Sequence, residues 1–166
     1  MNGYNVIINL MQIIPAINAR NFEETQKQME IAAQVVPPGG SIHIDVTDGK
    51  FTSNVTWGNP EELQELLTSY KLLIANFEVH LMVENPEEII EDWAKTRLAG
   101  RIIVHLEAMK DPDYILSRCR KYGAEPMLAV NPETDVKKLE PYFNQFLGFQ
   151  VLAVKPGSAG QKFKPE

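Results

Sequence analysis

The sequence predicts an α/β fold, a TIM (β/α)8-type barrel with about six βα units, in one domain over residues 1–166. Short apolar runs alternate with amphipathic stretches along the chain, which is typical of βαβ units and a parallel sheet. Polar side chains recur on one face of two consecutive predicted strands, which favours a barrel with its site at the mouth. No linker or low-complexity segment divides the chain.

Six apolar runs are the predicted strands, at residues 12–17, 41–46, 77–83, 101–106, 126–130 and 149–154. The five amphipathic stretches between them are the predicted helices, at residues 21–36, 59–73, 85–98, 112–122 and 135–143. Asn59 and Asn85 each precede Pro-Glu, which supplies a cap, a proline at the first helical position and an acid near the positive dipole end. Gly123 suits the end of the fourth helix. This count alone fits both an open doubly wound sheet and a closed barrel.

Alternation within two strands favours the barrel. Along the second predicted strand, His43, Asp45 and Thr47 share one face, and apolar β-branched residues occupy the other. Along the third, His80 and Met82 share a face. In an open sheet, helices would cover both faces and both should be apolar. Two neighbouring strands therefore present His, Asp and His toward one interior.

Two imidazoles and a carboxylate are a ligand set that suits Zn²⁺, Fe²⁺ or Mn²⁺. The alternative is that His43 and His80 are hydrogen-bonded interior residues without a ligand. A His-x-Asp strand beside a second histidine favours the metal, and rigid strands hold ligand geometry well. The sequence therefore predicts a divalent metal site at His43, Asp45 and His80.

A small-residue loop follows the last predicted strand, at residues 155–161. Such a loop lets backbone N–H groups approach a phosphate closely, although a plain βα turn has a similar composition. Acidic residues number 22 and basic residues 16, for a net charge of −6, which argues against a nucleic-acid partner. A small phosphorylated substrate is compatible with this charge, because a local site can be positive.

The single cysteine, Cys119, excludes a disulfide framework and fits a reducing, cytoplasmic location. Flanking cations could lower the pKa of its thiol, but an unreactive helix cysteine is the favoured interpretation. The apolar stretch at residues 5–17 is too short and too polar to span a bilayer, and it has no cationic start. We therefore expect no targeting signal and no membrane partner.

Several motifs, in order and at matching spacing, resemble the ribulose-phosphate 3-epimerase family. They run from about Gln12 to the last residue and are HIDVTDGKF at 43–51, VHLMVENP at 79–86, VHLEA at 104–108, NPET at 131–134, KPG at 155–157 and GQKF at 160–163. The opening IPAI at 14–17 and NF at 21–22 also match.

The resemblance implies a TIM barrel that interconverts D-ribulose 5-phosphate and D-xylulose 5-phosphate by proton transfer at C3 through an enediolate. His43, Asp45 and His80 match ligands of a divalent metal, and Asp45 also matches one of two catalytic aspartates. Met82 matches a methionine over the reacting carbons. Residues that match substrate contacts near the phosphate are Gly157, Ser158, Ala159 and Gly160.

Some residues depart from the family pattern. Ala16 replaces a substrate-contacting serine, Thr47 a methionine, and Lys155 a glutamate. Ser158 and Ala159 replace a bulkier, glycine-rich pair. This altered lining leaves open a related substrate, a hexulose 6-phosphate.

A complete barrel typically needs about 200 residues or more, whereas this sequence stops at Glu166. We therefore expect a C-terminally truncated barrel without its last two βα units and without the second catalytic aspartate. The first and last strands would be unpaired edges, so we expect a homo-oligomer. Two explanations stay open: an epimerase whose remaining part lies beyond Glu166, or a non-catalytic remnant that binds metal or phosphate.

Overall fold

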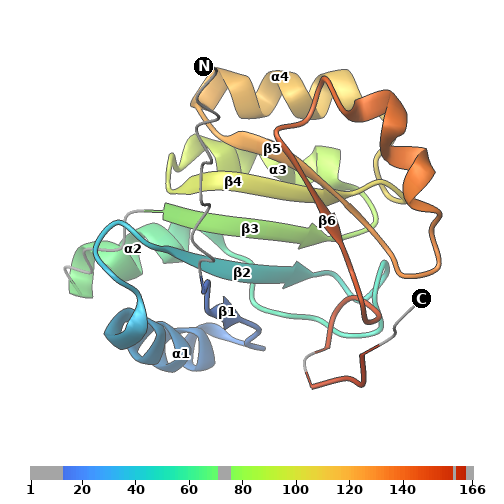
Figure 1. Ribbon diagram of the computed structural model, residues 1–166. Coiled ribbons are helices and arrows are strands. Elements are labelled where there is room, and N and C mark those ends of the chain that lie inside the picture. The colour runs from blue at the N-terminus through green and yellow to red at the C-terminus, as the bar shows by residue number, and fades with distance from the viewer. Residues whose placement is uncertain (1–12, 71–75, 159, 164–166) are drawn as a thin grey trace, which may run out of the picture.

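Six parallel strands form one sheet in the order β1-β2-β3-β4-β5-β6, as a computed structural model of the chain shows (Figure 1). The structure describes residues 13–70, 76–158 and 160–163. The elements are β1 (Ala16–Ile17), α1 (Phe22–Val35), β2 (Ser41–Thr47), α2 (Pro60–Tyr70), β3 (Asn76–Met82), α3 (Pro86–Lys95), β4 (Ala99–His105), α4 (Pro112–Tyr122), β5 (Glu125–Val130), the 3-10 helix η1 (Val136–Tyr142) and β6 (Gly148–Val151).

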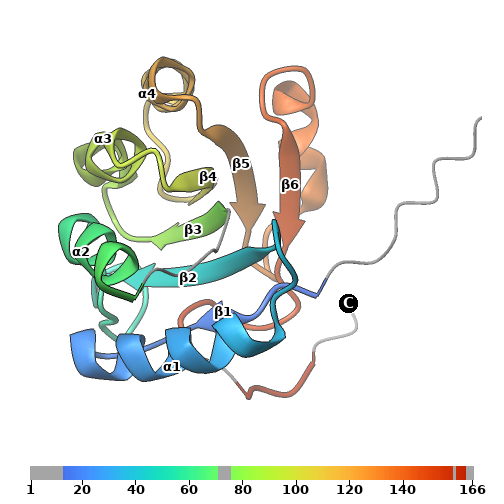
Figure 2. The ribbon, with the colours of Figure 1, turned by 90° about the vertical axis from the view of Figure 1, so that its left-hand side faces the viewer.

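The sheet curls, and α1 to α4 lie along its outer, convex side (Figure 2). Each strand pairs in parallel with the next one in sequence, from β1 with β2 to β5 with β6. Sequential order with a helical crossover between neighbours is the arrangement of barrel-type rather than doubly wound sheets. The predicted α/β fold is confirmed, and it is consistent with a TIM-type barrel.

Several element predictions need correction. The first strand, predicted at residues 12–17, forms only over Ala16–Ile17 among the described residues. The third helix, predicted at 85–98, ends at Lys95. The last strand ends at Val151 rather than at residue 154, although the N–H of Leu152 still donates to the carbonyl of Val130. The fifth helix forms only as the 3-10 helix η1, which contains Pro141. A proline lacks the N–H that an α-helix needs at an interior position, which explains the tighter, shorter element. Gln12 and residues 71–73, which were assigned to a strand and a helix, lie outside the described residues.

The three residues predicted to end helices all stand at helix ends, and two of them act there as predicted. Asn59 caps α2, because its side-chain oxygen accepts from the N–H of Glu62 at 3.2 Å. Gly123 ends α4 in the left-handed conformation with φ of 83°. Asn85 stands at the N-cap of α3 as predicted, but its side chain makes no cap hydrogen bond and instead accepts from Lys110 Nζ. In the described ranges, no helix is both long enough and apolar enough to cross a lipid bilayer.

The apolar face of each strand packs under the helices. The outer face of the sheet and the helices above it share one core, whose fully buried members include Met29, Ile42, Ile44, Leu63, Val79, Leu81, Ile90, Ile102, Val104, Ile115 and Leu128. Full burial of one such side chain stabilises the fold by about 1.5–3 kcal/mol relative to exposure. Because this core holds the sheet from outside, the inner face is left to carry polar groups.

Cys119 lies in this core and is fully buried. Burial raises the pKa of its thiol to about 12, despite the cations beside it in sequence. The interpretation of Cys119 as an unreactive helix cysteine is therefore favoured by the structure.

We predict that a disulfide reagent will not label Cys119 of the native chain at about pH 8, because the thiol is both inaccessible and protonated. The same chain in guanidinium chloride should react completely, which serves as the matched control. Fast labelling of the native protein would show that α4 does not pack as described.

Candidate metal and substrate site

The chain has three histidines, and all of them lie on the inner face of consecutive strands. His43 is on β2, His80 on β3 and His105 on β4. Asp45 stands directly opposite His80 in the register of β2 and β3. Alternation keeps His43 and Asp45 on the same face, so the parallel pairing brings imidazoles and a carboxylate together.

Three of these groups form a compact donor set. His43 Nε2 lies 3.2 Å and His80 Nδ1 lies 3.5 Å from Asp45 Oδ1. One ligand atom from each of His43, Asp45 and His80 falls within 4.8 Å of the others. The predicted convergence is confirmed, and two nitrogens with one carboxylate oxygen suit a divalent transition metal. The donor chemistry therefore fits the metal that the sequence implies.

The electrostatics of the three groups differ because their partners differ. Burial raises the pKa of Asp45, but hydrogen bonds from His43, His80 and Asn18 outweigh it and hold that pKa well below its usual range. Burial lowers the pKa of His80 to about 4, against the pull of Asp45. Burial also opposes charge on His43, but Asp45 and Glu78 raise its pKa to about 9. At neutral pH Asp45 is therefore ionised and His80 neutral, the forms in which both ligate metals. His43, with its raised pKa, carries an extra proton that it must release to bind a cation.

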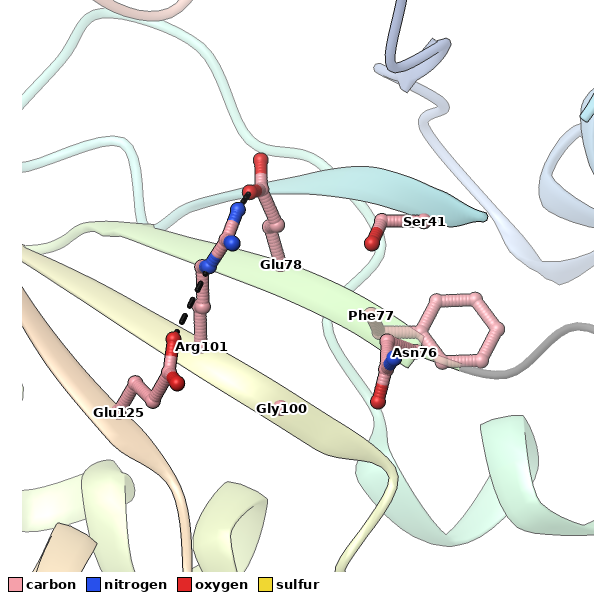
Figure 3. A pocket seen from close by; sticks show the side chains of 7 residues that line it. All are labelled: Ser41, Asn76, Phe77, Glu78, Gly100, Arg101 and Glu125. Atoms are coloured by element: carbon pink, nitrogen blue, oxygen red, sulfur yellow. Dashed lines mark hydrogen bonds and ion pairs between the residues drawn. The ribbon is translucent and has the colours of Figure 1, made fainter. Parts of the chain in front are cut away.

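A chain of ion pairs supports His43 from the side opposite Asp45. Glu78 Oε2 lies 3.2 Å from His43 Nδ1, and its other oxygen pairs with Arg101. Arg101 Nε in turn lies 3.2 Å from Glu125 (Figure 3). Glu78, Arg101 and Glu125 line a cavity of about 140 Å³. The sequence analysis gave them no role, although Glu78 lies two residues before His80 and so shares its face.

The donor set opens into a cavity of about 350 Å³ at the mouth. Met82 lines this cavity beside the histidines, and Gly157 and Ser158 line it from the loop after β6. Ala16 and Lys155, both departures from the family pattern, line it as well. Gly160 is exposed and outside the lining, and Ala159 lies outside the described residues.

Thr47 points elsewhere despite its position on the same strand face. Its side chain is buried, and its hydroxyl oxygen lies 3.4 Å from Thr56 Oγ1. The N–H of Thr47 also donates to that Thr56 oxygen at 2.9 Å. Thr47 therefore fixes the loop that follows β2 and is absent from the described lining of the mouth cavity.

Asn18 joins the carboxylate to the loop after β6, a link that the sequence analysis missed. Its Nδ2 donates to Asp45 Oδ2 at 3.0 Å and to the carbonyl of Gly157 at 3.4 Å. Asn54 donates to the same carbonyl. Gly157 has φ of 102°, and a Cβ there would lie 2.9 Å from Thr52 Cβ, so only glycine fits. The only sequence signal for Asn18 is its place just after the first strand.

Comparison with known proteins shows the family of this chain. The model of the family described as "Ribulose-phosphate 3 epimerase family" matches residues 12–166. The chain belongs to this family. The family resemblance predicted from the sequence motifs is confirmed, and the family is one of isomerases.

Relatives of this chain come from distant organisms. A ribulose-phosphate 3-epimerase of Chlamydia pneumoniae is 40% identical over 138 residues, which cover 81% of the chain and 58% of the relative. The enzyme of Candida glabrata is 32% identical over 170 residues, covering 93% and 66%. That of Methanocaldococcus jannaschii is 34% identical over 129 residues, covering 75% and 50%. This chain thus spans between half and two thirds of the length of these relatives.

We predict that the chain binds one Zn²⁺ and that His43→Ala weakens binding by at least about 100-fold, because a ligand matters more than its outer partner. Isothermal titration calorimetry measures both affinities. Glu84→Gln is the matched control, since Glu84 pairs with Lys50 outside the donor set. Equal affinity of the His43 variant and the wild-type chain would contradict the site.

Proposed function

We propose that this chain acts as a metal-dependent epimerase that interconverts D-ribulose 5-phosphate and D-xylulose 5-phosphate by proton transfer at C3. One observation carries the proposal: His43, Asp45 and His80 converge within 4.8 Å at the edge of an open cavity. Family membership and the names of the relatives support the same reaction. The two sugars differ only in configuration at C3, so the site must remove one proton and allow return to the other face.

We assign the metal site to His43, Asp45 and His80, with Zn²⁺, Fe²⁺ or Mn²⁺ as the candidate ions. A divalent cation there would stabilise the negative charge that develops on the substrate oxygens in the enediolate. His80 is buried on a central strand, and His43 is held by Glu78, so both rings have little freedom to move. Rigid placement keeps the substrate oxygens in one orientation relative to Asp45.

Asp45 is the proposed base. The C3 proton is acidic because the neighbouring C2 ketone takes up the resulting charge. The depressed pKa of Asp45 keeps it ionised and ready to accept a proton. Asn18 holds Oδ2 of this carboxylate at 3.0 Å, which fixes its orientation toward the cavity.

The remaining proposed contacts position the sugar phosphate. Met82 is soft and polarisable, and it lines the cavity where a planar intermediate would lie. The loop Gly157, Ser158, Ala159 and Gly160 is proposed to approach the phosphate through its backbone. Lys155 lines the same cavity and supplies a local positive charge on a chain of net charge −6.

We also propose a single barrel-type domain, a cytoplasmic location and a homo-oligomer. The buried free Cys119 is compatible with a reducing compartment. Self-association is supported by apolar side chains exposed near the β6 edge, where Leu147 is 71% and Val151 58% exposed. Ala16 in the cavity lining removes a hydroxyl, so a hexulose 6-phosphate is the second candidate substrate.

We predict that the Zn²⁺-loaded chain exchanges the C3 proton of D-ribulose 5-phosphate for deuterium in D₂O, measured by NMR. Asp45→Asn should slow the exchange by about 10²–10⁴-fold, because the amide cannot accept the proton. Asp92→Asn, on the outer helix α3, is the control and should exchange at the wild-type rate.

Exchange with a hexulose 6-phosphate but not with the pentulose would move the assignment to the second substrate. A wild-type chain that binds Zn²⁺ but exchanges neither sugar would contradict the proposed reaction and favour a non-catalytic role.

A further inference from the structure

A second imidazole lies directly behind His80, on the side away from Asp45. His80 Nε2 and His105 Nε2 are 2.9 Å apart, and the rings are nearly parallel, with 12° between their planes. Both side chains are buried, and the ring of Phe51 packs against His105 with centroids 4.7 Å apart. The two Nε2 atoms are therefore each other's hydrogen-bond partners.

The far nitrogen of His105 faces a carboxylate. His105 Nδ1 lies 3.3 Å from Glu107 Oε2. The other oxygen, Oε1, accepts from the N–H of Asn131 at 2.9 Å and from the hydroxyl of Thr134. Burial opposes the charge on Glu107, but hydrogen bonds from His105, Thr134 and the N–H of Asn131 bring its pKa to about 2. The donors from Asn131 and Thr134 also hold the carboxylate in place. Glu107 is thus a fixed acceptor at neutral pH.

Glu107, His105 and His80 form a hydrogen-bonded chain. The carboxylate at its end determines which ring nitrogens of the two histidines carry a proton. A carboxylate at Nδ1 of His105 requires the proton of His105 to be there, because a bare nitrogen would face a negative oxygen. His105 Nε2 is then bare and must accept from His80 Nε2. The proton of His80 therefore sits on Nε2, and its Nδ1, which faces Asp45, is bare.

We infer that Glu107, acting through His105, is a positioning residue that fixes the tautomer of His80 in which Nδ1 is free to bind a cation. The inference rests on the proposed metal site. Metal-binding histidines usually donate their second N–H directly to a carboxylate or carbonyl, as His43 does toward Glu78. His80 reaches its carboxylate through an intervening imidazole.

The opposite tautomer of His80, with the proton on Nδ1, is also stabilised by a hydrogen bond, so Glu107 is needed to select between the two. A proton on His80 Nδ1 could donate to Asp45, 3.5 Å away, and would block the metal position. His105 would then donate from Nε2 and leave a bare Nδ1 against Glu107. Asp45 already accepts hydrogen bonds from His43 and Asn18. An additional N–H from His80 therefore stabilises Asp45 less than the N–H of His105 stabilises Glu107.

The first test is nitrogen-15 NMR of the histidine rings in the metal-free wild-type chain, where protonated and bare nitrogens have well separated shifts. We expect the proton of His105 on Nδ1 and that of His80 on Nε2. A proton on Nε2 of His105 overturns the inference. This readout is independent of whether the chain binds metal or turns over a sugar.

The second test is Glu107→Gln. Its amide oxygen must stay at the Oε1 position to accept from Asn131, so the NH₂ group faces His105 Nδ1. The proton of His105 then moves to Nε2, that of His80 moves to Nδ1, and the ring shifts reverse. Calorimetry with Zn²⁺ should show affinity lower by about 10–100-fold.

Glu84→Gln is the matched control, because it removes one carboxylate without touching the three side chains and should keep wild-type shifts and affinity. Unchanged ring shifts in Glu107→Gln, or a loss of Zn²⁺ affinity below about fivefold, overturn the inference. A wild-type chain that binds no Zn²⁺ refutes the proposed metal site instead, and the ring shifts then still decide the role of Glu107.

Discussion

The parallel pairing of β2 with β3 is the constraint on which the rest of the site depends. Its register places Asp45 opposite His80, and the period of two puts His43 beside both. The same alternation turns the apolar residues of each strand outward, under the helices. A shift of one residue would exchange the two faces and would bury the polar groups in the core. Packing on the outside therefore fixes the chemistry on the inside.

Charges on the inner face are tolerated because each is held by a partner. Glu78 lies between His43 and Arg101, and Glu107 lies between His105 and donors from the loop after β5. Glu78 is buried, and an isolated charge there would cost several kcal/mol, whereas the paired one keeps its ionised form. The two carboxylates hold one metal-facing histidine each, Glu78 directly and Glu107 through His105. The inner face thus holds the metal-facing histidines from behind through two separate carboxylates.

The loop after β6, at the mouth of the site, is joined to the loops after β1 and β2 through one backbone carbonyl. The carbonyl of Gly157 accepts from Asn18 and Asn54, which come from the loops after β1 and β2. Asn18 also holds Asp45, so the proposed base and the proposed phosphate loop share one partner. Because a side chain at position 157 would collide with Thr52, the glycine is required for this close approach.

The sequence by itself determined the features that depend on local periodicity and short spacing. Alternation alone identified the shared face of His43 and Asp45. The order of strands and helices followed from the apolar runs and from the cap, proline and glycine residues between them. Only the tertiary structure decided which distant groups complete the site. The parts played by His105, Glu78 and Asn18 depend on inter-strand register and on the curl of the sheet, which no local pattern records. For the same reason Asn85, a good cap in isolation, instead binds Lys110 from a neighbouring loop.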